Sequence, residues 1–425
     1  MVAEEAAPTR APRWRRPLGR LGPLVVSRVA DQFSIGVASL WLAAVLGPEA
    51  FAPVSVLLIV NALSVSISDL GLGFVIMSLP GDERIAAGSL RRVRTINGAV
   101  CAATVAAGLI VRGEVGFIVA LCGPIWFATA EAYIRKSAAL KLNRIDQVFR
   151  AEVLGAVAML AVTAVIVVSG VSGAWIAVAL LAKGAVEAGS VRGYRAILHE
   201  GPASFRPGPE WVGQIMTYLV ANTDYFVIAV LLGPVDLSLY VIAYQTTAAV
   251  PVLTAKAFMQ MTFLDSSAAT SPEARQRAYG SHVRRALALG IAGGLVVAVV
   301  APVMPFVLGS DWEPVVPLMV LLAVAVPTRM LLGINVALAI TAGGARAVVR
   351  WEAGRLVATA VVVATAAAIG GLVPATAAVA AVSSAAITVE HLLACRVAGV
   401  RPDRLVVPWT ITAVLLAIGL AVALS

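Results

Sequence analysis

The chain has 425 residues, of which 60% are hydrophobic and only 13% are charged. Soluble proteins carry about 25% charged residues, so this composition excludes an ordinary soluble protein and indicates many membrane-spanning helices. The net charge of +9 does not indicate nucleic-acid binding, because the basic residues stand beside the ends of apolar stretches, where they set topology and meet anionic lipid headgroups.

Apolar stretches of about 17–28 residues follow one another along the chain, each long enough for a helix to cross ~30 Å of hydrocarbon. In chain order they occupy residues 22–46, 52–79, 95–111, 116–134, 151–169, 173–192, 211–232, 237–263, 286–309, 313–341, 352–370, 374–395 and 406–424. We therefore predict an all-α polytopic membrane protein with about 12–14 transmembrane helices.

Basic residues gather in every second break between these stretches, beginning with the N-terminal tail. The intervening breaks are short turns that hold a single basic residue, Arg112. Because cytoplasmic loops retain Lys and Arg, this alternation predicts a cytoplasmic N-terminus and places Ser425 outside. Arg28, Asp31 and Gln32 interrupt the first stretch, so we interpret it as an uncleaved span and not as a signal peptide.

A short repeat divides the chain. Leu46-Gly47-Pro48 ends the first stretch, and Leu232-Gly233-Pro234 ends the seventh. A shift of six helices preserves orientation, so we predict two six-helix lobes related by a parallel repeat, with an axis along the membrane normal. The expected domains are a cytoplasmic basic tail at 1–21, an N-terminal lobe at 22–192, a cytoplasmic linker at 193–210, a C-terminal lobe at 211–395 and an extra C-terminal transmembrane helix at 396–425.

Several polar residues stand inside the apolar stretches, where a charge costs at least ~2.5–3.5 kcal/mol on insertion scales. They concentrate in the first, second, seventh and eighth stretches, which are equivalent in the two lobes and would face a shared central cavity. The candidate substrate-binding residues of this cavity are Arg28, Asp31, Asp69, Asp224, Lys256 and Arg329. Positive charge there suits a phosphate or diphosphate group, because guanidinium and ammonium pair strongly with phosphate oxygens.

Some of these charges have a simpler interpretation. Lys183 and Glu187 are four residues apart and are expected to form an ion pair within one helix. Arg28 stands close enough to the inner interface to extend its side chain into it. For Asp224, the sequence leaves open whether it lines the cavity or supports polar packing between the lobes.

Motifs of catalysis and cofactor binding are absent from the sequence. It contains no GxxxxGK[ST], HExxH, GxSxG or CxxC string. The three histidines are scattered over two loops and one helix end, and the three cysteines fit neither a metal site nor a disulfide framework. We therefore expect a protein that is not an enzyme and that needs no cofactor or metal.

The paired hairpins resemble those of the polysaccharide flippases in the multidrug/oligosaccharidyl-lipid/polysaccharide exporter superfamily. The segments that carry the resemblance are Leu46–Phe51, Ser68–Gly73, Asn222–Tyr225, Leu231–Pro234 and Tyr240–Tyr244. The chain departs from the family pattern at Ala52 and Ser238, where glycine is usual, and at Tyr225, where a basic residue is common.

The resemblance implies a flippase that moves undecaprenyl-diphosphate-linked oligosaccharide from the inner to the outer leaflet of a bacterial inner membrane, by alternating access through a cationic cavity. It implies a lipid-linked oligosaccharide substrate, contact with membrane lipids, and a glycan polymerase or glycosyltransferases as partners.

Three alternatives remain at this point. A cation-coupled multidrug exporter of the same superfamily would use an acidic cavity built from Asp31, Asp69 and Asp224. A lipid II flippase for peptidoglycan is a closer alternative. A non-transporting scaffold of a glycan assembly complex is the third.

Overall fold

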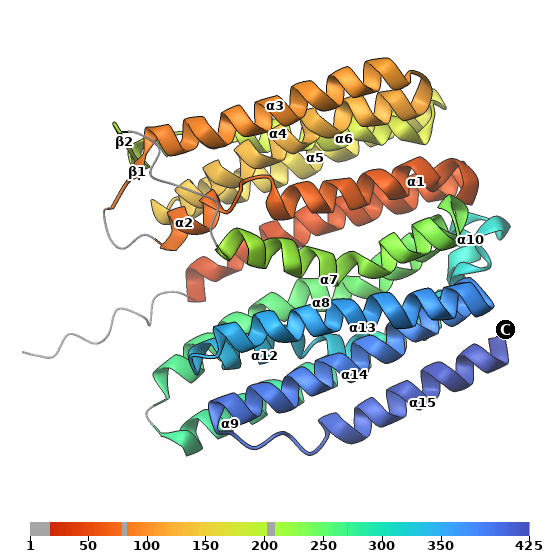
Figure 1. Cartoon of the computed structure of the whole chain (residues 1–425). Helices are drawn as coiled ribbons and strands as arrows, with labels where there is room; N and C mark the ends of the chain where they lie inside the picture. The colour runs from red at the N-terminus through yellow and green to blue at the C-terminus, as the bar shows by residue number, and fades with distance from the viewer. Residues whose placement is uncertain (1–17, 79–82, 202–208, 270, 425) are drawn as a thin grey trace, which may run out of the picture.

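The fold is almost entirely helical, and its helices run side by side (Figure 1). This computed structural model describes residues 18–78, 83–201, 209–269 and 271–424. Within those ranges, nine helices are long and apolar enough to cross a membrane. This finding confirms the expected all-α polytopic membrane protein.

The expected apolar stretches correspond to helices, although the ends differ by several residues and three stretches, 52–79, 286–309 and 313–341, are each divided between successive α-helices. The first half comprises α1 (Leu18–Ile67), α2 (Leu72–Ser78), α3 (Ala87–Val111), α4 (Gly113–Lys141), α5 (Ile145–Ser169), η2 (Gly173–Trp175), α6 (Ile176–Ser190) and η3 (Tyr194–Ile197). The second half comprises α7 (Pro209–Leu231), α8 (Pro234–Ala268), α9 (Pro272–Val300), η4 (Ala301–Val303), α10 (Met304–Leu308), η5 (Ser310–Trp312), α11 (Val315–Arg329), α12 (Leu332–Thr341), α13 (Ala345–Gly370), α14 (Leu372–Ala398) and α15 (Val406–Leu424). Strands β1 (Ile85–Ala86) and β2 (Leu198–His199) form a short parallel pair that the sequence did not indicate.

The repeated Leu-Gly-Pro segments form the same kind of turn in both halves. Gly47 has φ 69° and ψ 170°, and it breaks α1 into the two spans that the sequence predicts. Gly233, between α7 and α8, has φ 93° and ψ −177°. Glycine adopts a positive φ without the steric cost that a Cβ brings, and the proline that follows has its φ already set for a helix. The sequence repeat is therefore also a repeat of backbone conformation.

Helices pack mainly within each half of the chain. In the first half α1, α4, α5 and α6 pack against one another, and α3 packs against α4. In the second half α7, α8, α9, α11, α12, α13 and α14 form the other group, and α15 packs against α14 and α11. Helix α1 also contacts α7 and α8, which joins the two groups (Figure 1). The limits of two lobes and of a linker stay a prediction.

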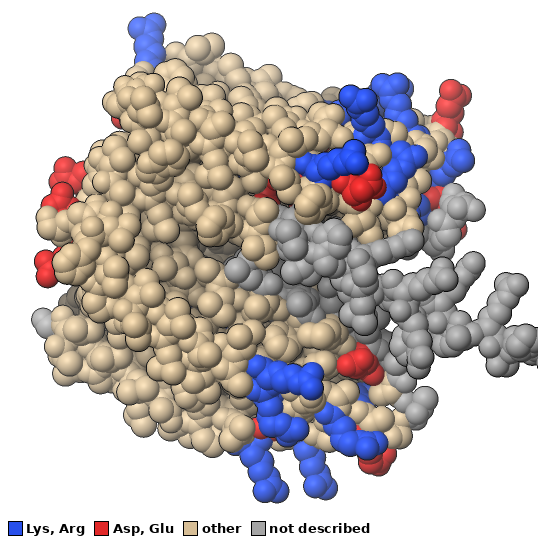
Figure 2. All heavy atoms as spheres, turned by 180° about the vertical axis from the view of Figure 1, so that it is seen from behind, with Lys and Arg blue, Asp and Glu red and all other residues tan. Residues whose placement is uncertain are grey.

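Charge is distributed unequally between the two ends of the helices. Figure 2 shows Lys and Arg side chains gathered toward one end of the molecule. We call it the basic end and define it by exposed Arg91, Arg277 and Arg350, near the starts of α3, α9 and α13. The opposite end carries the turns at Gly47 and Gly233. This asymmetry agrees with the alternation of charge in the sequence.

Among the described residues, the buried apolar core is shared most widely between the halves toward the opposite end. Its largest cluster includes Phe51 of α1, Tyr240 of α8, and Trp312 of η5. Toward the basic end the core divides. One cluster there, around Leu90, belongs to the first half and is covered by Trp211 of α7, whereas another, around Tyr279, lies wholly in the second half.

Candidate functional site

A buried polar cluster in the second half brings together two of the sequence-predicted residues, Asp224 of α7 and Arg329 of α11. The Asp224 carboxylate accepts hydrogen bonds from the Tyr240 hydroxyl and from the Tyr225 backbone N–H. The Arg329 guanidinium lies over the ring of Tyr244, with its central carbon 4.7 Å from the ring centroid. Tyr225, Tyr240 and Tyr244 also contact one another, mostly edge to face.

One nitrogen of the Arg329 guanidinium stands outside the hydrogen bonds that the described residues form. Its Nη1 atom is buried and has no hydrogen-bond partner among the described residues. No carboxylate of a described residue lies within 4 Å of the guanidinium as an ion-pair partner. A buried charge is costly unless it is paired, so this nitrogen is placed to donate a hydrogen bond to an anionic or carbonyl oxygen of a bound molecule.

Asp31 lies in a separate network in the first half. Its carboxylate is 2.6 Å from the Lys183 ammonium of α6, which is also 2.6 Å from the Glu187 carboxylate. The Lys183–Glu187 pair confirms the ion pair expected from their spacing. Glu187 in turn accepts from Lys136 of α4 at 2.7 Å, and Lys136 approaches Glu152 of α5 at 3.4 Å. Charges of alternating sign therefore connect α1, α4, α5 and α6.

Asp69 occupies a structural position at the turn between α1 and α2. Its two carboxylate oxygens accept from the backbone N–H groups of Gly71, at 3.0 Å, and Gly73, at 2.7 Å. The side chain is buried. Both acceptor atoms therefore serve the first turn of α2, in the manner of a helix N-cap.

Two of the six predicted residues fall outside this description. Arg28 lies in α1 and Lys256 in α8, but their side chains are outside the described residues. The structure brings together Asp224 and Arg329, and it holds Asp31 and Asp69 at two other places. A single cavity lined by all six residues stays a prediction.

Several residues of these clusters were not predicted from the sequence. Four of the seven tyrosines of the chain lie between positions 218 and 244, a concentration that signals a polar aromatic site. The links from Lys136 to Glu152 and Glu187 join positions far apart in the sequence, and no local spacing indicates them.

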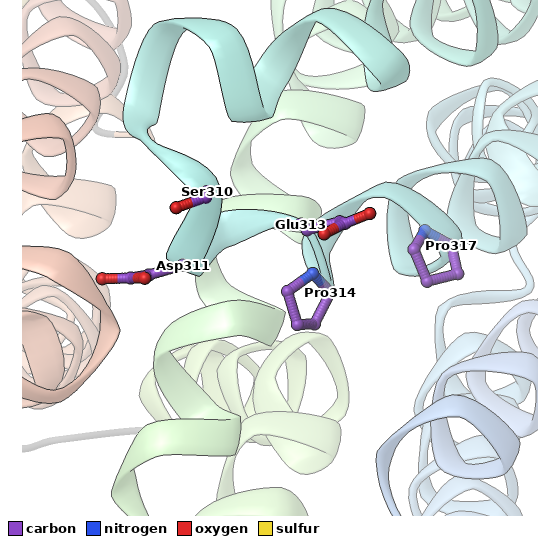
Figure 3. Close-up of a pocket in the computed structure, with 5 residues that line it drawn as sticks. All are labelled: Ser310, Asp311, Glu313, Pro314 and Pro317. Atoms are coloured by element: carbon purple, nitrogen blue, oxygen red, sulfur yellow. The ribbon is translucent and has the colours of Figure 1, made fainter.

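A surface hollow lies at the opposite end, at the turn between α10 and α11 (Figure 3). Its volume is about 490 Å³, and its lining residues are Ser310, Asp311, Glu313, Pro314 and Pro317. Two carboxylates and no basic side chain line it. This hollow is therefore not the cationic cavity that the sequence predicts.

Part of the second half matches a known protein family. The model of a family described as polysaccharide biosynthesis protein matches residues 208–317. That segment contains α7, α8 and α9, and it includes Asp224, Tyr240 and Tyr244. No curated protein sequence matches the chain significantly.

Solved transporter structures share the whole fold. An inward-facing multidrug resistance MATE family transporter of the MOP superfamily is 14% identical, with a TM-score of 0.67 over 88% of this chain and 98% of that one. An outward-facing MATE family transporter is 15% identical, with a TM-score of 0.56 over 90% and 96%. The lipid II flippase MurJ, in an inward closed conformation, is 11% identical, with a TM-score of 0.60 over 96% and 92%. These matches confirm the resemblance drawn from the paired hairpins, at the level of the fold.

Proposed function

We propose that this chain is a membrane transporter that moves undecaprenyl-diphosphate-linked oligosaccharide from the inner to the outer leaflet of a bacterial inner membrane, by alternating access through a cationic central cavity. The observation that carries the proposal is the buried Nη1 atom of the Arg329 guanidinium, which has no hydrogen-bond partner among the described residues. The matched family description, polysaccharide biosynthesis protein, and the fold shared with a lipid II flippase support it.

Arg329 is suited to hold a diphosphate. Its guanidinium is fixed from one side by the Tyr244 ring, which leaves a planar set of N–H donors in a defined orientation. Charge-assisted hydrogen bonds from arginine to phosphate are short and strong, and they strengthen further where water is excluded. Lys256 of α8 is the second cationic residue that we assign to the cavity, from its place in the sequence.

The acidic residues count against the multidrug exporter. A cavity that attracts organic cations needs carboxylates that are available to them. Asp31 is paired with Lys183, Asp69 accepts from two backbone N–H groups, and Asp224 accepts from Tyr240. All three carboxylates are already engaged by donors of the chain itself.

The proposed direction of transport follows from the charge of the two ends. The basic end is assigned to the cytoplasm because Lys and Arg are retained there, which places the N-terminus inside. Lipid-linked oligosaccharide would enter from this side. A glycan polymerase or glycosyltransferases are the protein partners that this role implies.

The test is a leaflet-translocation assay in proteoliposomes with a fluorescent undecaprenyl-diphosphate oligosaccharide. Arg329→Ala should lower the rate roughly ten- to a hundredfold, because it removes charged hydrogen bonds to phosphate worth about 1.5–3 kcal/mol. Arg329→Lys keeps the charge without the planar donor set and should retain part of the activity. Arg285→Ala removes an exposed arginine from α9 of the same half and should leave the rate unchanged.

Other outcomes separate the alternatives. A wild-type protein that moves no lipid but expels an organic cation would favour the multidrug exporter. A protein that moves neither, and that is needed only for assembly of other glycan enzymes, would favour the scaffold. Full activity in both Arg329→Ala and Lys256→Ala would keep the flippase and reject the cationic site.

A further inference from the structure

A tryptophan of the second half is buried against the first half at the opposite end. Trp312 lies in η5, and its side chain is completely buried. The indole Nε1–H donates a hydrogen bond to the backbone oxygen of Ala43 in α1, at 2.9 Å. Phe51 meets the Trp312 ring edge to face, with 5.6 Å between the ring centroids. Trp312 therefore contacts α1 on both sides of the break at Gly47.

Both partners of this contact are held in fixed positions. Ala43 lies in the last turn before the break in α1, where backbone carbonyl groups begin to lack partners within the helix. On the other side, the backbone N–H of Trp312 donates to the Gly309 oxygen at 3.1 Å, and Gly309 has a φ of 105°. The tight turn presents the indole to α1 as a preformed group.

Other hydrogen bonds join the halves nearer the basic end, and they do not involve Trp312. The Tyr218 hydroxyl of α7 donates to the Ile59 oxygen of α1 at 2.9 Å. The Trp211 indole N–H, also in α7, donates to the Ile67 oxygen at 3.0 Å. Helix α7 would therefore stay on α1 if the contact of Trp312 were lost.

We propose that Trp312 is the latch that holds the opposite end closed, and that its release from Ala43 opens the central cavity on that side. The inference rests on the proposed function, because only a transporter requires the two halves to part at this end. The apolar core agrees with a closed end, since its largest cluster crosses between the halves around Trp312. The higher TM-score to the inward-facing MATE structure than to the outward-facing one also agrees.

Electron paramagnetic resonance distances test the latch. Spin labels at Val168 of α5 and Phe306 of α10, which are 85% and 90% exposed, would report the separation of the halves at the opposite end. Labels at Arg91 and Arg285 would report the basic end. The three native cysteines are replaced in this background, and the protein is measured in lipid nanodiscs.

Trp312→Phe keeps an aromatic ring and removes the N–H donor. Loss of one hydrogen bond should raise the ratio of open to closed molecules at the opposite end about fivefold. Trp312→Ala should raise it further. The matched control is Trp126→Phe, which removes an indole hydrogen bond of 2.7 Å to Asn97 within the first half and should not change the ratio.

Two results would overturn the latch. One is a wild-type protein that is already mostly open at the opposite end. The other is a ratio that stays unchanged in both Trp312 variants while the folded protein elutes as a single species. A raised ratio in protein that translocates no lipid would support the latch and count against the proposed flippase, so the two failures are distinguishable.

Discussion

Replacing Lys183 by methionine should destabilise the folded protein more than any substitution at an exposed charge. Its ammonium is 2.6 Å from both Asp31 and Glu187, and its side chain is only 13% exposed. Each contact corresponds to a gross attraction of about 6 kcal/mol at an effective dielectric constant of 20. Desolvation of the three groups offsets much of that sum, and breaking a buried pair from one side typically costs about 3–5 kcal/mol.

Both carboxylates lose the same ammonium. Glu187 keeps Lys136 at 2.7 Å after the substitution, and Asp31 loses the ammonium that lies 2.6 Å from it. The double variant Asp31→Asn with Lys183→Met should lower the stability by less than the sum of the two single variants, because the two side chains are in direct contact.

Thermal unfolding of the purified protein in detergent, followed by intrinsic fluorescence, measures these effects. The midpoint of Lys183→Met should fall by on the order of 5 °C or more. Arg92→Met, at an exposed position of α3, is the control and should leave the midpoint within a degree or so. A Lys183→Met protein as stable as the wild type would refute the reasoning. Strictly additive losses for Asp31→Asn and Lys183→Met would refute the direct coupling of these two side chains.

Three further predictions concern other contacts. Asp69→Ala should lower the free energy of unfolding by about 1–2 kcal/mol because it removes a helix cap, and Asp69→Asn should lower it by less. Chemical denaturation in mixed micelles measures the free energy of unfolding of both variants. Gly123→Ala should separate α3 from α4, because an added Cβ would lie 2.6 Å from the Cα of Cys101. The control is Gly98→Ala, whose added Cβ would meet nothing within 4 Å. The melting midpoint should therefore be lower for Gly123→Ala than for Gly98→Ala. Tyr240→Phe removes a donor to buried Asp224 and should cost about 1–3 kcal/mol, seen as a lower yield of folded protein at a given temperature.

Local spacing explains what the sequence could predict. The Lys183–Glu187 pair follows from a separation of one helical turn, and the twin turns at Gly47 and Gly233 follow from identical tripeptides. For Asp69, the place in an apolar stretch predicts a cavity residue and does not indicate its backbone contacts. The glycines two and four residues after it were a signal for a capped turn, because they let the backbone approach the carboxylate.

Long-range partners explain the rest. Asp31 and Lys183 come from the first and last helices of their half, and Trp312 meets Ala43 from the other half of the chain. No periodicity within one helix encodes such pairs. The hydrogen-bond state of Arg329 likewise depends on how α7, α8 and α11 pack, which a single sequence does not specify.

The twin turns also bear on how the chain is made. At Gly47 and Gly233 the backbone reverses within a few residues, and the nearest charges are single acids, Glu49 and Asp236. During biosynthesis each of these two turns then brings only a single acid across the bilayer. On the proposed topology the basic residues stay on the side of synthesis, so each of the two hairpins could insert as a unit without exporting a long polar loop.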